Sequence, residues 1–233
     1  MVNGALTLSN GTTIPGGTIS PLPEGGYSPA SQPKTIARFV QQGSKLVGTG
    51  GVGAPLQGNS VALSADGNTA LIGGPGDNTG TGAVWVFARG NGTWTQQAKL
   101  LGGGVTSGSG QGRSVALSAD GNTALVGVPG DNNGAGAVLV FTRSNGTWTQ
   151  QGGELVGTGG VGAPHQGNSV ALSADGNTAL IGGPLDDYGI GAAWVFRRSN
   201  GIWTQQGNKL VSDILVSGIT SQGLSVALSA DGN

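Results

Sequence analysis

Cysteine is absent from this chain of 233 residues, and charged residues make up only 9% of it. Without cysteine there is no disulfide and no thiolate chemistry. The net charge is −1, and lysine and arginine are scattered along the sequence. A nucleic-acid-binding protein or a protein bound to an anionic membrane surface typically carries a basic patch. We therefore expect no nucleic-acid partner.

Long apolar runs are also missing. No stretch approaches the roughly 18 apolar residues that a membrane span needs. The N-terminal segment Met1–Leu6 has neither a basic region nor an apolar core, so it does not have the pattern of a secretory signal peptide. We expect no membrane insertion. Glycine is abundant, with 49 residues, but regular apolar alternation such as Gly82–Phe87 indicates a folded chain rather than a linker.

Residues suited to catalysis are scarce. The chain has one histidine, His165, which replaces Leu56 of an otherwise identical segment. The only glutamates, Glu24 and Glu154, lie far apart in the sequence. A catalytic site normally gathers titratable groups and departs from the symmetry of its scaffold. We interpret His165 as a varied loop residue and predict that the chain is not an enzyme.

One nine-residue stretch organises the chain. Ser-Val-Ala-Leu-Ser-Ala-Asp-Gly-Asn occurs four times, beginning at Ser60, Ser114, Ser169 and Ser225. The copies are 54 to 56 residues apart. A fixed period of this size indicates a repeat architecture.

Each repeat has the pattern of four strands. In the first, Ser60–Ser64 and Thr69–Gly73 flank an Asp-Gly turn, and Ala83–Phe87 and Thr93–Gln97 flank an Asn-Gly turn. No ten-residue window has a helical period, so we predict essentially no helix. Four antiparallel strands per repeat of about 55 residues are typical of a β-propeller blade. The predicted fold is therefore all-β, a complete or partial propeller.

The repeats define two regions. Residues 1–34 are rich in proline and glycine and form either an extended arm or a degenerate repeat, although residues 5–14 loosely echo the Ser60–Asn68 stretch. Residues 35–233 hold the blades. Three blades are complete, and the fourth is split between an outer strand within Ile36–Val47 and an inner strand at Ser225–Ser229. The complete blades span Ser60–Leu101, Ser114–Val156 and Ser169–Val211.

Two short motifs carry a resemblance to a known family. Gln57-Gly58 opens the segment before the first strand, and Gly73-Gly74-Pro75 ends the second strand. The unit resembles the FG-GAP repeat, the blade type of integrin α-subunit propellers and of many bacterial surface proteins. That family usually has Phe-Gly and Gly-Ala-Pro at these places. The resemblance covers about residues 36–233 and implies a propeller, whereas the family's functions include adhesion, ligand binding and scaffolding. Glutamine takes the place of this phenylalanine in all four copies, so the packing that is usual for the family at this position is not expected here.

Many FG-GAP repeats carry a calcium loop, and this resemblance directs attention to the loops between the second and third strands. Each loop here has one or two acids, fewer than the six to eight oxygen ligands that calcium takes. We interpret these acids as turn residues that bond their own backbone. If calcium binds, Asp186 and Asp187 are the candidate ligands. Asp66, Asp120 and Asp175 are interpreted as residues of the Asp-Gly hairpins.

Tryptophan recurs at two fixed blade positions. Trp94, Trp148 and Trp203 lie on the predicted outer strands, just after a turn. Aromatic rings there favour either sugar stacking or packing between blades. We keep these three residues as candidate glycan-binding residues.

The last copy suggests a mode of assembly. Val226, Ala227 and Leu228 form an apolar strand that no second strand follows, and an unpaired edge invites pairing with another chain. We expect this strand to be covered by residues 5–14 of the same chain, by a second subunit or by sequence beyond Asn233. We expect a non-enzymatic structural or adhesive module of a cell surface, an extracellular filament or a virion. Its partners would be other copies of itself or a surface or virion protein. The alternative is a carbohydrate-binding propeller that binds glycans.

Overall fold

The computed structural model describes residues 6–7, 13–14, 41–212 and 218–233. The chain divides into two compact units, Met1–Gln41 and Gln42–Asn233. In the first unit, β1 (Leu6–Thr7) pairs antiparallel with β2 (Thr13–Ile14), so that Leu6 lies opposite Ile14. The rest of the predicted arm, residues 1–34, lies outside the described residues.

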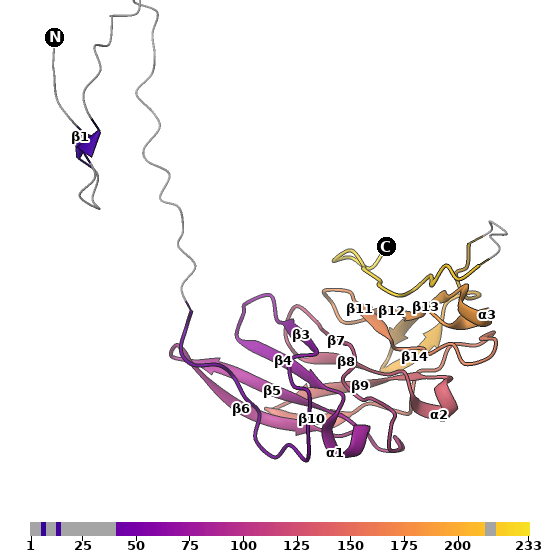
Figure 1. The fold of residues 1–233 in the computed structure, drawn as a ribbon, viewed down its shortest axis with the longest axis horizontal. Helices are drawn as coiled ribbons and strands as arrows, with labels where there is room; N and C mark the ends of the chain where they lie inside the picture. The colour runs from indigo at the N-terminus through magenta and orange to yellow at the C-terminus, as the bar shows by residue number, and fades with distance from the viewer. Residues whose placement is uncertain (1–5, 8–12, 15–40, 213–217) are drawn as a thin grey trace, which may run out of the picture. The chain divides into compact units, whose positions relative to one another are not determined.

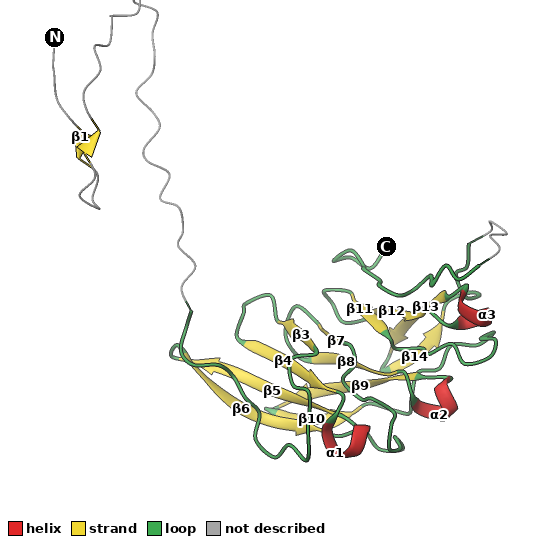
Figure 2. Ribbon diagram, viewed as in Figure 1, coloured by secondary structure: helices red, strands yellow, loops and turns green. Residues whose placement is uncertain are grey.

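The second unit contains three four-stranded antiparallel sheets, which follow one another along the chain (Figures 1 and 2). In each sheet the strands pair in sequence order, as in a meander. This confirms the predicted four-stranded blades. Within the described residues no helix is long and apolar enough to cross a membrane. The strands are β3 (Ser60–Leu63), β4 (Thr69–Gly74), β5 (Ala83–Gly90) and β6 (Thr93–Leu100) in blade 1; β7 (Val115–Leu117), β8 (Thr123–Val128), β9 (Ala137–Ser144) and β10 (Thr147–Gln150) in blade 2; and β11 (Ser169–Leu172), β12 (Thr178–Gly183), β13 (Ala192–Ser199) and β14 (Ile202–Gln205) in blade 3.

The loop between the second and third strands differs from the helix-free expectation. Each loop forms one four-residue turn: α1 (Asp77–Gly80), α2 (Asp131–Gly134) and α3 (Asp186–Gly189). These turns are not right-handed helices, because their two central residues have positive φ. In α1 these are Asn78 at 46° and Thr79 at 55°. Sequence periodicity cannot detect such a turn, since one turn has no period.

The blades stack face to face through apolar side chains. Leu71, Val84 and Val86 of blade 1 form one buried cluster with Val126 and Leu139 of blade 2. Leu125 and Val140, from the other face of blade 2, join the cluster of Trp194 in blade 3. The first strands of successive blades contact each other in order, β3 with β7 and β7 with β11. Blade 2 is therefore covered on both faces.

Glycine lets adjacent blades approach closely at one recurrent point. Gly73, near the end of β4, lies so near Gly112 of the next blade that an added Cβ would overlap the Gly112 carbonyl oxygen. Gly127 meets Gly167, and Gly182 meets Gly223, in the same way. The first glycine of the Gly-Gly-Pro or Gly-Val-Pro motif therefore marks the contact between blade backbones.

The fourth blade does not form as predicted. Ser225–Ser229 is not a strand, and neither is the described part, 41–47, of the segment that was expected to supply the outer strand. The physical reason is that a strand needs a partner for its backbone groups, and neither segment has its second and third strands beside it. Instead, 42–48 lies against blade 1, and 222–233 lies against blade 3. The described residues therefore show three blades with a fragment of a further blade at each end, and no closed ring.

Candidate functional site

Buried glutamine side chains lie at the junctions between blades. Gln111, which stands in the place of the family's phenylalanine, is fully buried between blades 1 and 2. Its side-chain oxygen accepts a hydrogen bond from Gly102 N at 3.0 Å, and its amide nitrogen donates to Leu100 O at 3.1 Å. The side chain thus pairs both backbone groups at the end of the preceding outer strand. We call this arrangement the glutamine clamp.

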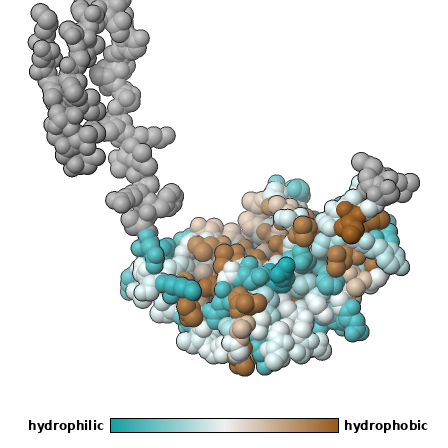
Figure 3. Space-filling model, in the orientation of Figure 1, coloured by the Kyte–Doolittle hydropathy of each residue, from teal (hydrophilic) through white to brown (hydrophobic). Residues whose placement is uncertain are grey.

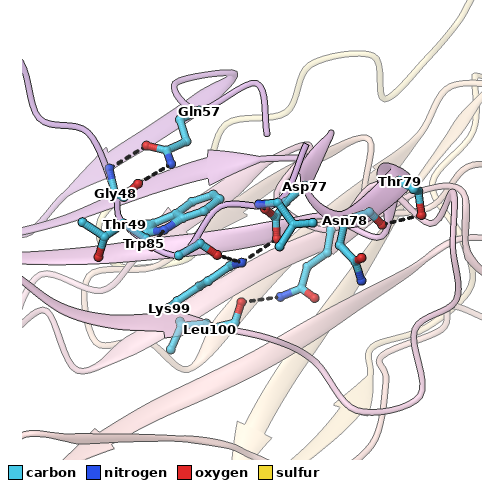
Figure 4. A network of polar contacts seen from close by, with 12 residues as sticks. Gly48, Thr49, Gln57, Asp77, Asn78, Thr79, Trp85, Lys99 and Leu100 are labelled. Atoms are coloured by element: carbon cyan, nitrogen blue, oxygen red, sulfur yellow. Dashed lines mark hydrogen bonds and ion pairs between the residues drawn. The ribbon is translucent and has the colours of Figure 1, made fainter. Parts of the chain in front are cut away.

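The glutamine clamp recurs at the other junctions. Gln57 makes the same pair of bonds to Gly48, at 2.7 and 2.8 Å, as Figure 4 shows. Gln166 bonds Gly157 at 2.5 and 2.9 Å, and Gln222 accepts from Ser212 N at 2.7 Å. The recurrent glutamine thus forms hydrogen bonds with the backbone at all four places.

Each outer-strand tryptophan lies beneath an arginine of the neighbouring strand. The guanidinium carbon of Arg143 is 5.4 Å from the ring centroid of Trp148. Arg143 also reaches the preceding blade, donating to Gln97 Oε1 at 3.1 Å and to Thr69 Oγ1 at 3.3 Å. Arg198 repeats these contacts over Trp203 in blade 3, and Arg89 covers Trp94 in blade 1. The arginines therefore connect consecutive blades.

The Asp-Gly hairpins are held by their own side chains. Asp66 Oδ1 accepts from Ser64 Oγ at 2.5 Å and from Asn68 N at 2.9 Å. Asp120 and Asp175 make the equivalent bonds. This confirms the interpretation of these aspartates as hairpin residues. Neighbouring hairpins are also joined, since Ala65 N donates to Ala119 O and Ala119 N donates to Ala174 O, both at 2.9 Å.

A buried aspartate begins each of the turns α1, α2 and α3. In blade 1, Asp77 Oδ2 is 2.6 Å from Lys99 Nζ, and its Oδ1 accepts from Val52 N at 2.7 Å (Figure 4). In blade 3, Asp186 is held in the same way by Lys209 at 2.5 Å and by Val161 N at 2.7 Å. In blade 2 the lysine position holds Glu154. The middle blade therefore departs from the symmetry of the other two.

The segment from β6 to β9 has a counterpart among known protein families. Residues 94–141 match the family model of the FG-GAP repeat. This segment is therefore similar to the FG-GAP repeat. The matched residues begin on the outer strand of blade 1 and end on the third strand of blade 2, so they include the Gln111 clamp and the Gly127 contact. No curated protein matches the chain.

In the three blades the predicted glycan residues occupy packed positions. Trp94, Trp148 and Trp203 are half-buried, and each packs against the apolar cluster of its junction. Their rings therefore contact an arginine and a core cluster. Trp203 Nε1 donates to Gln151 Oε1 at 3.2 Å, whereas the buried Trp148 Nε1 has no hydrogen-bond partner. The glycan role of these residues stays a prediction.

The candidate calcium ligands differ in their surroundings. Asp186 is buried, and its two oxygens bind Lys209 and Val161 N. Asp187 is half-buried, with a positive φ of 46°. Among the described residues, no group of three or more His, Cys, Asp or Glu side chains lies close enough to hold a metal ion. A lysine already occupies the position where a cation would neutralise Asp186, and this contact could not be read from the sequence.

The proposed assembly edge lies on the outer face of blade 3. Val226 and Leu228 are half-buried, and Ala227 is exposed. The segment is fixed on both sides: Ser169 Oγ donates to Gly223 O at 2.8 Å, and Ala174 N donates to Ala230 O at 2.8 Å. The fourth copy thus docks as β7 docks on blade 1, but without a ladder partner of its own.

The outer face of blade 1, which no complete blade covers, exposes apolar side chains. Val61 is 66% exposed there, whereas its counterpart Val115, inside a junction, is 9% exposed. A groove of about 410 Å³ runs along this face, lined by residues that include Leu46, Pro55 and Ile72. Figure 3 shows apolar side chains in several groups on one face of the unit. Sequence reasoning singled out the edge at Val226 and did not foresee this groove.

Proposed function

We propose that this chain is a non-enzymatic structural or adhesive module of a cell surface, an extracellular filament or a virion, and that it assembles through the edges of its blades. The observation that supports this best is the use made of its recurrent polar side chains. The glutamines, hairpin aspartates and arginines bond neighbouring blades or their own turns. The repeated residues therefore build a stack, and contact with partners is left to the outer faces and edges.

The apolar exposure of the outer faces supports the assembly part of the proposal. Val61 and Leu63 on blade 1 are 66% and 56% exposed. On blade 3, Leu180 and Val195 are half-buried, whereas their counterparts in blades 1 and 2 are fully buried. Exposed apolar residues gathered on one face are typical of an interaction surface. Partners would be other copies of the chain or a surface or virion protein.

A glycan-binding function has less support in this geometry. A sugar stacks on the free face of an aromatic ring, and the outer-strand tryptophans already contact an arginine on their rings. A sugar would have to displace that arginine, which also links two blades.

Sedimentation of the intact chain over a wide concentration range tests the proposed function. We expect a mass above that of one chain, and Val61→Asp with Leu63→Asp, or Val226→Asp with Leu228→Asp, should reduce the chain to single copies. Thr93→Asp, on the exposed start of β6, is the control and should leave the mass unchanged. A single-chain mass at all concentrations, together with glycan binding that Trp148→Ala abolishes, would favour the alternative.

A further inference from the structure

The middle blade contains two acids where the flanking blades contain an acid and a base. Lys99 precedes Leu100 in blade 1, and Lys209 precedes the equivalent Leu210 in blade 3. Each lysine forms an ion pair with the aspartate that begins its blade's turn. In blade 2 the equivalent residue is Glu154, and the aspartate is Asp131. A carboxyl group thus takes the place of an ammonium.

The surroundings of Asp131 and Glu154 hold no compensating charge. Asp131 is 2% exposed, and its Oδ1 is 3.4 Å from both N and Oγ1 of Thr106. Glu154 Oε2 accepts from Asn132 Nδ2 at 3.1 Å, and its Oε1 lies beside Gly104. Within the part of the chain that the structure describes, both ion pairs lie in the other blades.

The elements around the pair add one further titratable group. The segment from Gly102 to Gln111, which covers the turn, contains no acid or base. His165, from the segment before blade 3, packs against Gly134 at the far end of α2. The pair is therefore isolated from cations, with one histidine beside the same turn.

Two neighbouring carboxylates, one buried and one half-buried, cannot both be ionised without an electrostatic cost. Desolvation by burial and the neighbouring Asp131 carboxylate raise the pKa of Glu154 above its ordinary value of 4.5. A proton held between the two groups removes one charge and supplies a hydrogen bond between them. Loss of that proton leaves two negative charges at the contact between α2 and the end of the outer strand.

We propose that a proton held on Glu154, beside the buried Asp131, makes blade 2 a pH-sensitive joint in an otherwise repetitive stack. The joint is closed while the proton is held and loosens when both groups are ionised. Because the folded chain holds the proton more tightly than the unfolded chain, this contribution is complete below the ordinary pKa of glutamate and is lost as the pH rises through the raised value. Each unit of difference in pKa changes the folding equilibrium about tenfold.

The test is urea unfolding of the full chain, with a chelator present, between about pH 5 and about pH 8, joined with amide exchange of residues 131–136. As the pH rises, we expect two changes in the wild type. The unfolding midpoint should fall, and the protection of this turn, taken relative to the intrinsic exchange rate at each pH, should also fall. Glu154→Lys, which restores the ion pair of the flanking blades, should raise the unfolding midpoint at the upper pH and remove the dependence of the midpoint on pH. Glu154→Gln, which cannot ionise, should also remove it.

Two control variants separate this pair from other titrations. His165→Leu, which copies Leu56 of the first repeat, should keep the wild-type profile. Lys209→Glu should create a second acid pair and steepen the profile. Identical profiles for the wild type, Glu154→Lys and Glu154→Gln would overturn the proposal. So would added calcium that restores the wild-type midpoint at the upper pH, because a cation rather than a proton would then join the two acids.

Discussion

Individual side chains at the junctions decide how closely two blades can approach. The side-chain amide of Gln111 supplies both a donor and an acceptor. It donates to the carbonyl oxygen of Leu100 and accepts from the backbone nitrogen of Gly102. An apolar side chain of similar size fills the volume but leaves both backbone groups without partners. Buried groups in that state cost free energy, because water no longer reaches them.

Gln111→Leu should lower the free energy of unfolding by about 2–4 kcal/mol, since it orphans two buried backbone groups. Chemical denaturation at neutral pH measures the change. Gln57→Leu removes the same two hydrogen bonds at a half-buried position, where water can replace them, so its effect should be smaller. Equal losses of unfolding free energy in the two variants would show that the stabilising effect of the glutamine clamp does not depend on its burial.

A second residue-scale prediction concerns the glycine contact. Gly127→Ala should destabilise the chain by at least about 3 kcal/mol, because the added Cβ meets the backbone of Gly167, which cannot move without separating two blades. Gly153→Ala is the matched control, with nothing near its added Cβ, and should be close to neutral. A mild effect of Gly127→Ala would mean that the blades can shift apart cheaply.

At the scale of one element, the Asp-Gly hairpin is a self-contained unit that also joins its neighbours. In blade 3, bonds from Ser173 and from the backbone of Asn177 hold the pKa of Asp175 below its ordinary value of 3.8. The ionised carboxylate is therefore the form that the folded hairpin favours. Its contribution is present above the ordinary pKa and is lost as the pH falls through the lowered value.

Asp175→Asn should accordingly lower the free energy of unfolding at neutral pH. Below about pH 4 the stability of this variant should depend less steeply on pH than that of the wild type. The asparagine keeps an acceptor but loses the charge that strengthens bonds to Ser173 and Asn177. Thermal unfolding from about pH 2 to about pH 7 measures both effects. Asp187→Asn, outside any hairpin, serves as the control. If the stability of Asp175→Asn below about pH 4 changed with pH as in the wild type, this account would be contradicted. This acid effect is opposite in sign to that of the Glu154 pair.

At the scale of the whole molecule, stability in a stack of repeats is a sum of blade and junction terms. Blade 2 has a junction on each face, whereas blades 1 and 3 each have one complete junction. Amide exchange should therefore be slowest in β8 and β9 and faster in β4 and β5 and in β12 and β13. Hydrogen-exchange mass spectrometry at neutral pH measures the gradient, and faster exchange in β8 than in β4 would contradict it.

Much of the blade could be predicted from local pattern. The predicted strands Ser60–Ser64, Thr69–Gly73, Ala83–Phe87 and Thr93–Gln97 lie within three residues of the observed ends, because alternation and Asp-Gly or Asn-Gly turns act over a few residues. The junction contacts could not be predicted in this way. Gly127 lies against Gly167 only because two sheets stack. The position of Glu154 has meaning only once the Asp–Lys pairs of the flanking blades are seen.

The sequence by itself determined the repeat, its four strands and the hairpin role of Asp66, because these depend on contacts between residues close in the chain. Only the tertiary structure decided what the recurrent glutamine does, which tryptophan faces are covered, and that the terminal copies dock as fragments. These depend on groups from different blades, whose meeting is set by sheet stacking. The same distinction separates Asp131 and Glu154, unremarkable in the sequence, from the acid pair that they form in the folded blade.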